Sequence, residues 1–222
     1  MEYRIEHDSM GEVKVPANVY WAAQTERSHE NFNIGVGIET MPQEIIHAFG
    51  ILKKAAAIAN SELKPAKMTA EKLGAISAAC DEVISGKLNA HFPLVVWQTG
   101  SGTQSNMNAN EVIANRANEI AGSKLCHPND DINMSQSSND TFPTAMHIAA
   151  VIAIEDKVIP AIDLLVSTFK KLEAENEGIV KSGRTHLQDA TPITFSQEIS
   201  GWRSSLEKDK KLLEIALPEL KE

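Results

Sequence analysis

Cysteine and aromatic residues are scarce in this sequence. Its 222 residues include two cysteines, Cys80 and Cys126, and aromatic residues make up 5% of the chain. Two cysteines are too few for a disulfide framework or a cysteine-based zinc site. The low aromatic fraction and plentiful alanine suit close-packed helices better than a β-sandwich. A hydrophobic fraction of 42% in a chain of this length is sufficient for a core.

Long apolar runs and basic clusters are also lacking. No apolar run reaches about 18 residues, so we expect no membrane-spanning segment. The net charge is −9 without a basic patch, which argues against nucleic acids and anionic membranes as partners. Residues 1–8 are charged and lack the apolar core of a signal peptide, so a reducing, cytoplasmic compartment is expected.

The pattern along the chain is mainly helical after residue 40. Residues 1–40 show little helical periodicity, and we expect short strands at 3–5 and 13–15. Apolar residues then recur at helical spacing, with an interruption expected at Pro160. Helix starts are predicted at Thr69, at Ser105 or Asn106, at Asp140 or Thr141, and at Thr194, which forms a capping box with Gln197.

These patterns predict a mainly α fold in two parts. Residues 1–138 form a mostly helical N-terminal domain with short strands, and residues 139–222 form the first part of a bundle of long helices. The last two helical segments have long apolar stripes, and few segments of this chain are available to cover them. We therefore expect the remaining helices of the bundle to come from elsewhere, either further sequence or other subunits.

Three polar segments interrupt the helical pattern. Residues 98–106 (QTGSGTQSN) and residues 135–141 (SQSSNDT) each precede a helix and offer hydroxyl, amide and free N–H donors, which suit a carboxylate or phosphate. Each could equally be a capped turn. The first is not a Walker loop, because no Gly-Lys-Ser/Thr follows, and its glycine spacing is wrong for a dinucleotide fingerprint.

The third polar segment, residues 181–192 (KSGRTHLQDATP), adds a titratable group. His186 lies beside Thr185, and a histidine near its usual pKa of about 6.5 can give or take a proton at neutral pH. Alone, this segment could be a polar connection whose histidine only makes a hydrogen bond. Together, the three segments suit an enzyme acting on a small polycarboxylate, because proton removal beside a carboxylate requires fixed donors to stabilise the developing charge.

A fourth segment, residues 127–131 (HPNDD), is a turn by composition. His and Asp together suggest a metal-ligand pair, but two residue types alone do not define a metal site.

Long motifs give the chain a family resemblance. Residues 97–106 (WQTGSGTQSN), 135–140 (SQSSND) and 183–192 (GRTHLQDATP) resemble the fumarase/aspartase superfamily, over nearly the whole chain from about Arg4. Within the superfamily, Trp97, Ser135 and residues 199–202 (ISGW) are similar to class II fumarate hydratases, whereas aspartate ammonia-lyases tend to have other residues there.

The resemblance implies reversible hydration of fumarate to L-malate, a dicarboxylate substrate, and no cofactor or metal. It also implies a homotetramer built on a long-helix bundle, with active sites that each draw on three subunits. His186 matches the proton-transfer histidine of the family. The matching substrate-binding residues are Ser101, Gly102, Thr103, Ser137, Ser138, Asn139 and Thr185, and a secondary carboxylate site matches His127, Pro128, Asn129 and Asp130.

One family motif is absent from these 222 residues. No Gly-Ser-Ser-x-Met-Pro-x-Lys-x-Asn loop occurs, and in the family its serine is taken as the base that removes the C3 proton of malate. We therefore expect the chain to be the N-terminal portion of such an enzyme and to be inactive alone. Two alternatives stay open: an aspartate ammonia-lyase, and a non-catalytic truncated homologue acting in assembly or binding.

Overall fold

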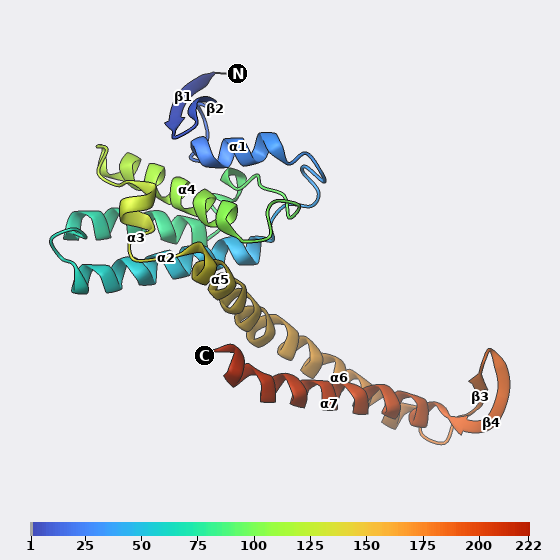
Figure 1. Cartoon of the computed structure of the whole chain (residues 1–222). Helices are drawn as coiled ribbons and strands as arrows, with labels where there is room; N and C mark the ends of the chain where they lie inside the picture. The colour runs from blue at the N-terminus through green and yellow to red at the C-terminus, as the bar shows by residue number, and fades with distance from the viewer. Residues whose placement is uncertain (1) are drawn as a thin grey trace. The chain divides into compact units, whose positions relative to one another are not determined.

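The structure is a computed structural model that describes residues 2–222 (Figure 1). The chain forms two compact units, residues 1–149 and 150–222. The division falls inside helix α5 (Ser138–Ala153), and the predicted domain boundary after residue 138 coincides with the start of that helix. The boundary itself stays a prediction, and each unit is described by itself.

The first unit opens with two strands where short strands were expected, and they pair antiparallel. Strands β1 (Tyr3–Asp8) and β2 (Gly11–Pro16) pair from Tyr3 opposite Pro16 to Asp8 opposite Gly11. Every second residue of β2 enters the core, so Val13 and Val15 are buried. Helix α1 (Ala23–Asn31) follows and was not predicted. Its buried face includes Thr25, Glu26 and Ser28, so it gives no apolar periodicity in the sequence.

Three long helices form the core of the first unit. Helix α2 (Gln43–Leu63) packs on α3 (Ala70–Ile84), and α3 packs on α4 (Thr103–Ala121). Short helical turns lie at Asn89–His91 (η1) and Pro128–Ile132 (η2). Large, fully buried apolar side chains come from these helices, from the loop before α3 and from β2: Phe49, Met68, Ile76, Val83, Val112, Ile113 and Val15.

The predicted helix starts are partly right. Thr69 caps α3, because its hydroxyl accepts the N–H of Lys72 at 3.3 Å. Two other predictions were misplaced: the N-cap of α4 is Gly102 and not Ser105 or Asn106, and α5 begins at Ser138 and not at Asp140 or Thr141. In the first case, a left-handed Gly102 serves as the N-cap residue, and no side chain is needed as the cap.

The second unit is a helical pair joined by a β-hairpin. A π-helical turn, η3 (Ile154–Val158), leads into α6 (Ile159–Glu175), so the hydrogen-bond pattern of the helix changes just before Pro160, where a kink or break was expected. Strands β3 (Val180–Thr185) and β4 (Gln188–Thr194) then form an antiparallel hairpin that periodicity did not reveal. Helix α7 (Phe195–Leu220) packs on α6 and begins with the predicted capping box of Thr194 and Gln197.

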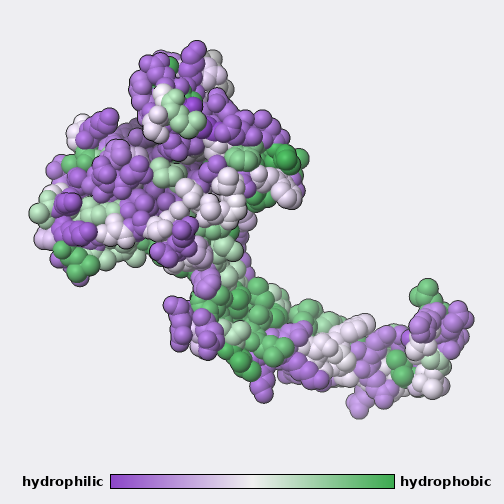
Figure 2. Space-filling view, in the orientation of Figure 1, coloured by the Kyte–Doolittle hydropathy of each residue, from purple (hydrophilic) through white to green (hydrophobic). Residues whose placement is uncertain are grey.

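The apolar stripes of this unit are largely uncovered by the described residues. Buried apolar side chains are limited to Val166, Ile199 and Leu217 in residues 150–222. Figure 2 shows hydrophobic surface on this unit in green. Large side chains exposed by more than half are Leu164, Val180, Leu187, Trp202, Leu212 and Ile215. An exposed apolar surface of this kind is typical of an interface with another protein segment or subunit. Within residues 2–222, no helix is both long and apolar enough to cross a membrane.

Candidate active site

The first predicted segment forms the start of helix α4. Gly102 has φ +75°, and a Cβ atom there would lie 2.2 Å from Phe142 Cγ and 2.4 Å from Phe142 Cβ. A glycine is therefore required for backbone conformation and for close approach to α5. Thr103 follows at the helix N-terminus, and its hydroxyl lies 3.3 Å from that of Ser101. Both hydroxyls are exposed beside the free N–H groups that begin the helix.

The second predicted segment meets the first. Ser138 begins α5, and its hydroxyl lies 2.9 Å from the Thr103 hydroxyl. Ser137 accepts the N–H of Asn139 at 3.2 Å, so the backbone turns into the helix at this point. Two helix N-termini and a chain of three hydroxyls thus come together in the first unit. Helix N-termini carry partial positive charge, so this arrangement can bind an anion within a chain of net charge −9.

The third predicted segment lies in the other unit, at the tip of the β3–β4 hairpin. Thr185 pairs with Gln188, so the loop consists of His186 and Leu187 alone. Both have positive φ, 50° and 62°, as a type I′ turn requires. Asn-Gly is the sequence that such turns favour, so turn stability does not explain His-Leu here. A strained turn that carries an exposed imidazole indicates a functional position.

The fourth segment, predicted as a turn, forms the single helical turn η2. His127 Nδ1 accepts the N–H groups of Asn129 and Asp130, both at 3.3 Å. The ring proton of the neutral form therefore lies on Nε2, where it can be donated to a ligand. The His127 N–H donates to Asp131 at 2.8 Å, which fixes the turn. Residues 2–222 hold no group of three His, Cys, Asp or Glu side chains placed to bind a metal.

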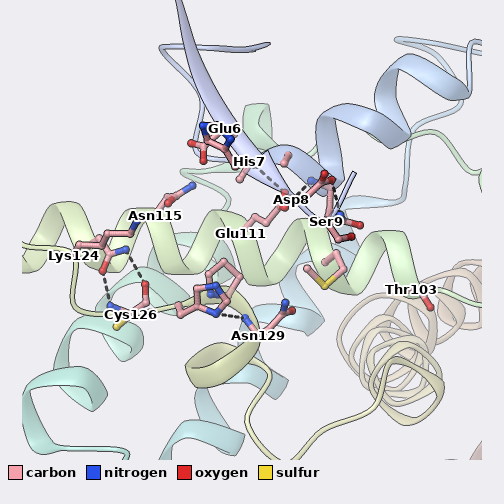
Figure 3. Close-up of a pocket in the computed structure, with 17 residues that line it drawn as sticks. Glu6, His7, Asp8, Ser9, Thr103, Glu111, Asn115, Lys124, Cys126 and Asn129 are labelled. Carbon is pink, nitrogen blue, oxygen red and sulfur yellow. Dashed lines mark hydrogen bonds between the residues drawn. The ribbon is translucent and has the colours of Figure 1, made fainter. Parts of the chain in front are cut away.

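The first and fourth segments line one cavity of about 550 Å³ (Figure 3). Thr103 lies on its wall, as do His127 and Asn129, and Lys124 supplies a cationic side chain. Three carboxylates on the wall are already engaged by other groups. Glu6 is paired with Arg4 at 2.7 Å. Asp8 is paired with Arg27 at 2.7 Å, and Glu111 is bonded to backbone N–H groups.

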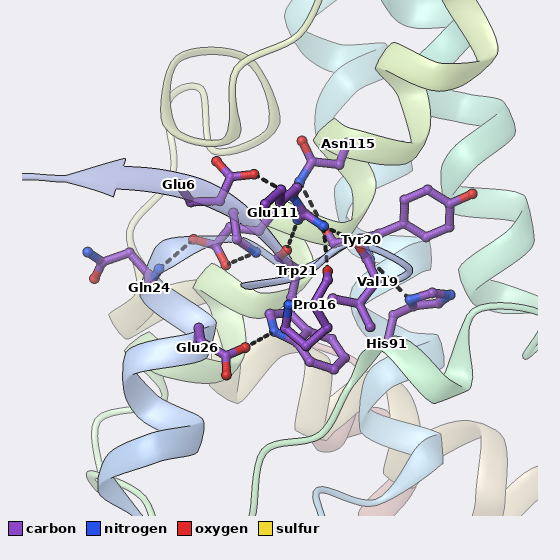
Figure 4. A network of polar contacts seen from close by, with 12 residues as sticks. Glu6, Pro16, Val19, Tyr20, Trp21, Gln24, Glu26, His91, Glu111 and Asn115 are labelled. Atoms are coloured by element: carbon purple, nitrogen blue, oxygen red, sulfur yellow. Dashed lines mark hydrogen bonds and ion pairs between the residues drawn. The ribbon is translucent and has the colours of Figure 1, made fainter. Parts of the chain in front are cut away.

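Glu111 was not predicted as a site residue, and it organises the cavity wall. This buried carboxylate accepts the N–H groups of Ala22, Gln24 and Thr25 at 2.9, 2.9 and 3.1 Å (Figure 4). Glu111 lies on α4 and therefore caps the start of α1 from a distant part of the sequence. No residue close to α1 in the sequence predicts this cap. Burial raises the pKa of Glu111, while these hydrogen bonds oppose that shift. The sequence signal was a glutamate directly before the buried Val112 and Ile113.

The remaining contacts of Figure 4 anchor the N-terminal strands to this wall. Arg4 donates to the carbonyl oxygens of Pro16 and Val19 at 2.9 and 2.7 Å, and Trp21 Nε1 donates to Glu26 at 2.5 Å. The Arg4 bonds satisfy two backbone carbonyl oxygens, and the Trp21 bond pairs two buried side chains.

Fold and site together define an α-helical protein with donor-rich loops suited to an anion and a histidine on a separate hairpin. The profile of a lyase family matches residues 11–222. The chain belongs to that lyase family. The fold class predicted from the sequence, helical with short strand pairs, is confirmed, as is the resemblance to the superfamily.

The individual relatives are fumarate hydratases. The chain is 60% identical to "Fumarate hydratase class II" of Campylobacter jejuni, over all of this chain and 48% of that protein. It is 62% identical to the Bacillus cereus protein of the same name, over 96% of this chain and 46% of that protein. The chain thus spans about half the length of the curated relatives it matches.

Solved structures agree with these relatives. The class II fumarase from Schistosoma mansoni superposes with a TM-score of 0.91 at 41% identity, covering 99% of this chain and 46% of that one. A fumarate lyase:delta crystallin from Brucella melitensis gives a TM-score of 0.89 at 41% identity, covering 99% of this chain and 50% of that one.

Proposed function

We propose that this chain carries the carboxylate-binding part of a fumarate hydratase, which interconverts fumarate and L-malate. The observation that carries the proposal is the contact of Thr103 with Ser138, which joins two helix N-termini into one donor-rich site. Relatives at 60% and 62% identity named as fumarate hydratases support the choice of substrate.

The chemistry explains the need for these donors. When malate is dehydrated, the proton on C3 leaves, and its electron pair delocalises onto the adjacent carboxylate. The C2–O bond then breaks, the C2=C3 bond forms, and hydroxide leaves as water after gaining a proton. Fixed hydroxyl and N–H donors at a helix start stabilise the extra negative charge on the carboxylate without reorganisation during the reaction.

Each predicted residue receives a role in this scheme. Ser101, Gly102 and Thr103 bind one substrate carboxylate, and Ser137, Ser138 and Asn139 bind the other. Thr185 orients the substrate, and His186 orients or shuttles a proton through a water molecule. A base for C3 and further donors would come from a segment that these 222 residues do not contain. The exposed apolar stripes of α6 and α7 favour an assembly of several copies, as in a homotetramer.

A secondary carboxylate site at residues 127–130 forms part of the proposal. Its support is the Nε2–H donor of His127 and the presence of Lys124 on the same cavity wall. The cavity also reaches Thr103, so an anion bound near His127 has a path toward the first loop.

Mixing this chain with the C-terminal half of the Bacillus cereus relative tests the proposed activity. We expect the mixture to convert malate to fumarate, which is followed by absorbance at 240 nm, because the second half supplies the missing base. Each half alone is expected to be inactive.

The same mixture separates the rival functions. Release of ammonia from aspartate without turnover of malate would identify an ammonia-lyase and overturn the proposal. A co-eluting complex of the two halves that is inactive toward both substrates would favour a non-catalytic role in assembly or binding.

A further inference from the structure

A lysine side chain is buried beneath the two loops of the candidate site. Lys53 on α2 is 1% exposed, and its ammonium nitrogen faces three amide oxygens. These belong to Asn106 at 2.7 Å, Asn133 at 3.1 Å and Gln136 at 3.0 Å. An ammonium group has three N–H donors, so each one has an acceptor.

Within residues 2–222, no carboxylate forms an ion pair with Lys53 that would compensate this charge. Burial lowers the pKa of Lys53 to about 7, and the titratable group that acts on it, Cys80 of α3, is itself held neutral because burial raises its pKa to about 12. A buried cation without an anionic partner is costly, which is why the pKa falls, and the charged form that prevails below about pH 7 depends on the three amide oxygens. A position that needs only packing would be better filled by an apolar residue.

The amide groups connect Lys53 to both anion-binding loops. Asn106 lies one helical turn after Thr103, and its Oδ1 also accepts the hydroxyl of Thr141 at 2.9 Å. Thr141 in turn lies one helical turn after Ser138. Gln136 directly precedes Ser137 in the second loop. The same ammonium group therefore contacts α4 below the first loop and the segment that leads into the second.

Asn60 on α2 and Lys64 just after it bind the same segment. Asn60 donates to the carbonyl oxygen of Met134 at 3.0 Å, and Lys64 donates to Ser135 at 2.9 Å. Lys53 and Asn60 are seven residues apart and lie on one face of α2, and Lys64 is the residue that directly follows the helix. Ser135 has φ 60°, a strained conformation that these contacts maintain.

We propose that Lys53 is a positioning residue: its buried ammonium group fixes residues 132–141 and the start of α4, so that Thr103 and Ser138 face the same anion. The identity of that anion as fumarate rests on the proposed function. The effect of Lys53 on the order of the loop does not.

Hydrogen exchange of the 222-residue chain tests this role. We expect Lys53→Met to speed amide exchange in residues 132–141 at least about tenfold, because three amide oxygens lose a charged donor. Exchange in α1 and α3 should stay unchanged. Lys54→Met is the matched control, since Lys54 is the next residue on α2 and makes only a solvent-exposed pair with Asp81. Unchanged exchange in residues 132–141, or an equal increase throughout the chain, would overturn the proposal.

A second pair of variants tests the same contact without replacing the buried Lys53 side chain. Gln136→Met and Gln136→Glu both lose the amide donors to Ile132 and Met134, but only the glutamate keeps an oxygen for Lys53. We expect faster exchange in residues 137–141 for the methionine variant than for the glutamate variant. Equal rates in the two variants would contradict a role for the Lys53 contact.

Addition of fumarate separates the two proposals. Amide shifts of Thr103 and Ser138 in NMR spectra should move when fumarate is added to the wild-type chain, and the Lys53→Met variant should need at least about tenfold more fumarate for the same response. A wild-type chain that does not respond would count against the proposed function, and the exchange rates would still decide the role of Lys53.

Discussion

Replacing His186 by asparagine is expected to lower the rate of malate dehydration about 10²–10⁴-fold in the restored two-part enzyme, if His186 transfers a proton. The substitution should leave the hairpin intact. His186 occupies the first position of a two-residue turn with positive φ, and asparagine is favoured at that position. The variant therefore removes the titratable group while keeping the backbone.

The measurement is the initial rate at 240 nm as a function of malate concentration, with His29→Asn as the control. His29 is a partly exposed histidine on α1 that lies 3.8 Å from Glu26 and has no place in the proposed site. A rate equal to that of the unsubstituted enzyme would assign His186 a structural role in the turn.

Gly102→Ala is expected to destabilise the first unit by about 2–4 kcal/mol. Part of this cost comes from placing alanine at φ +75°, and the larger part from its Cβ atom. The contact with Phe142 Cβ at 2.4 Å cannot be relieved by turning the aromatic ring, so the starts of α4 and α5 must separate. That separation would also break the contact between the hydroxyls of Thr103 and Ser138. We therefore expect the variant to bind fumarate more weakly as well as to be less stable.

Two other glycines resolve these contributions in urea unfolding experiments. Gly122→Ala also has positive φ, 66°, but its Cβ atom meets nothing within 4 Å, so it measures backbone strain alone. Gly100→Ala lies in the same loop with neither strain nor contact and should have little effect. If Gly102→Ala were no more destabilising than Gly122→Ala, the close approach of α4 to α5 would not be as described.

The parts of the fold that could be predicted are those with a local signal. The capping box at Thr194 and the strands around Val13 and Val15 depend on side chains close in sequence, and the structure has both. The start of α4 was misplaced because the cap at Gly102 depends on backbone conformation and on contact with α5.

The parts that could not be predicted depend on contacts between distant residues. Helix α1 is capped by Glu111, 88 positions after its first residue, Ala23, and its own buried face is polar. In the sequence, Lys53 is one of two adjacent lysines in a helical segment, and nothing distinguishes it from Lys54. Only the fold shows that Lys53 is buried and Lys54 is not. The three polar segments were found from composition and motif, but spacing alone does not bring them together.

The site predictions differ in how far the described geometry supports them. Ser101, Thr103 and Ser138 lie within hydrogen-bonding distance along one chain of hydroxyls, and His127 shares a cavity with Thr103. Thr185 and His186 belong to the second unit, so their place in the same site stays a prediction. In the proposed assembly, the hairpin of one copy would complete a site whose loops come from another.

A crystal structure of the restored complex with bound fumarate would test the central claim most directly. We predict one dicarboxylate with Ser101 or Thr103 and Ser138 from one copy, and His186 from a neighbouring copy, all within hydrogen-bonding distance of the ligand or of a single bridging water. Fumarate bound away from the starts of α4 and α5, or with every His186 remote from the ligand, would contradict the account.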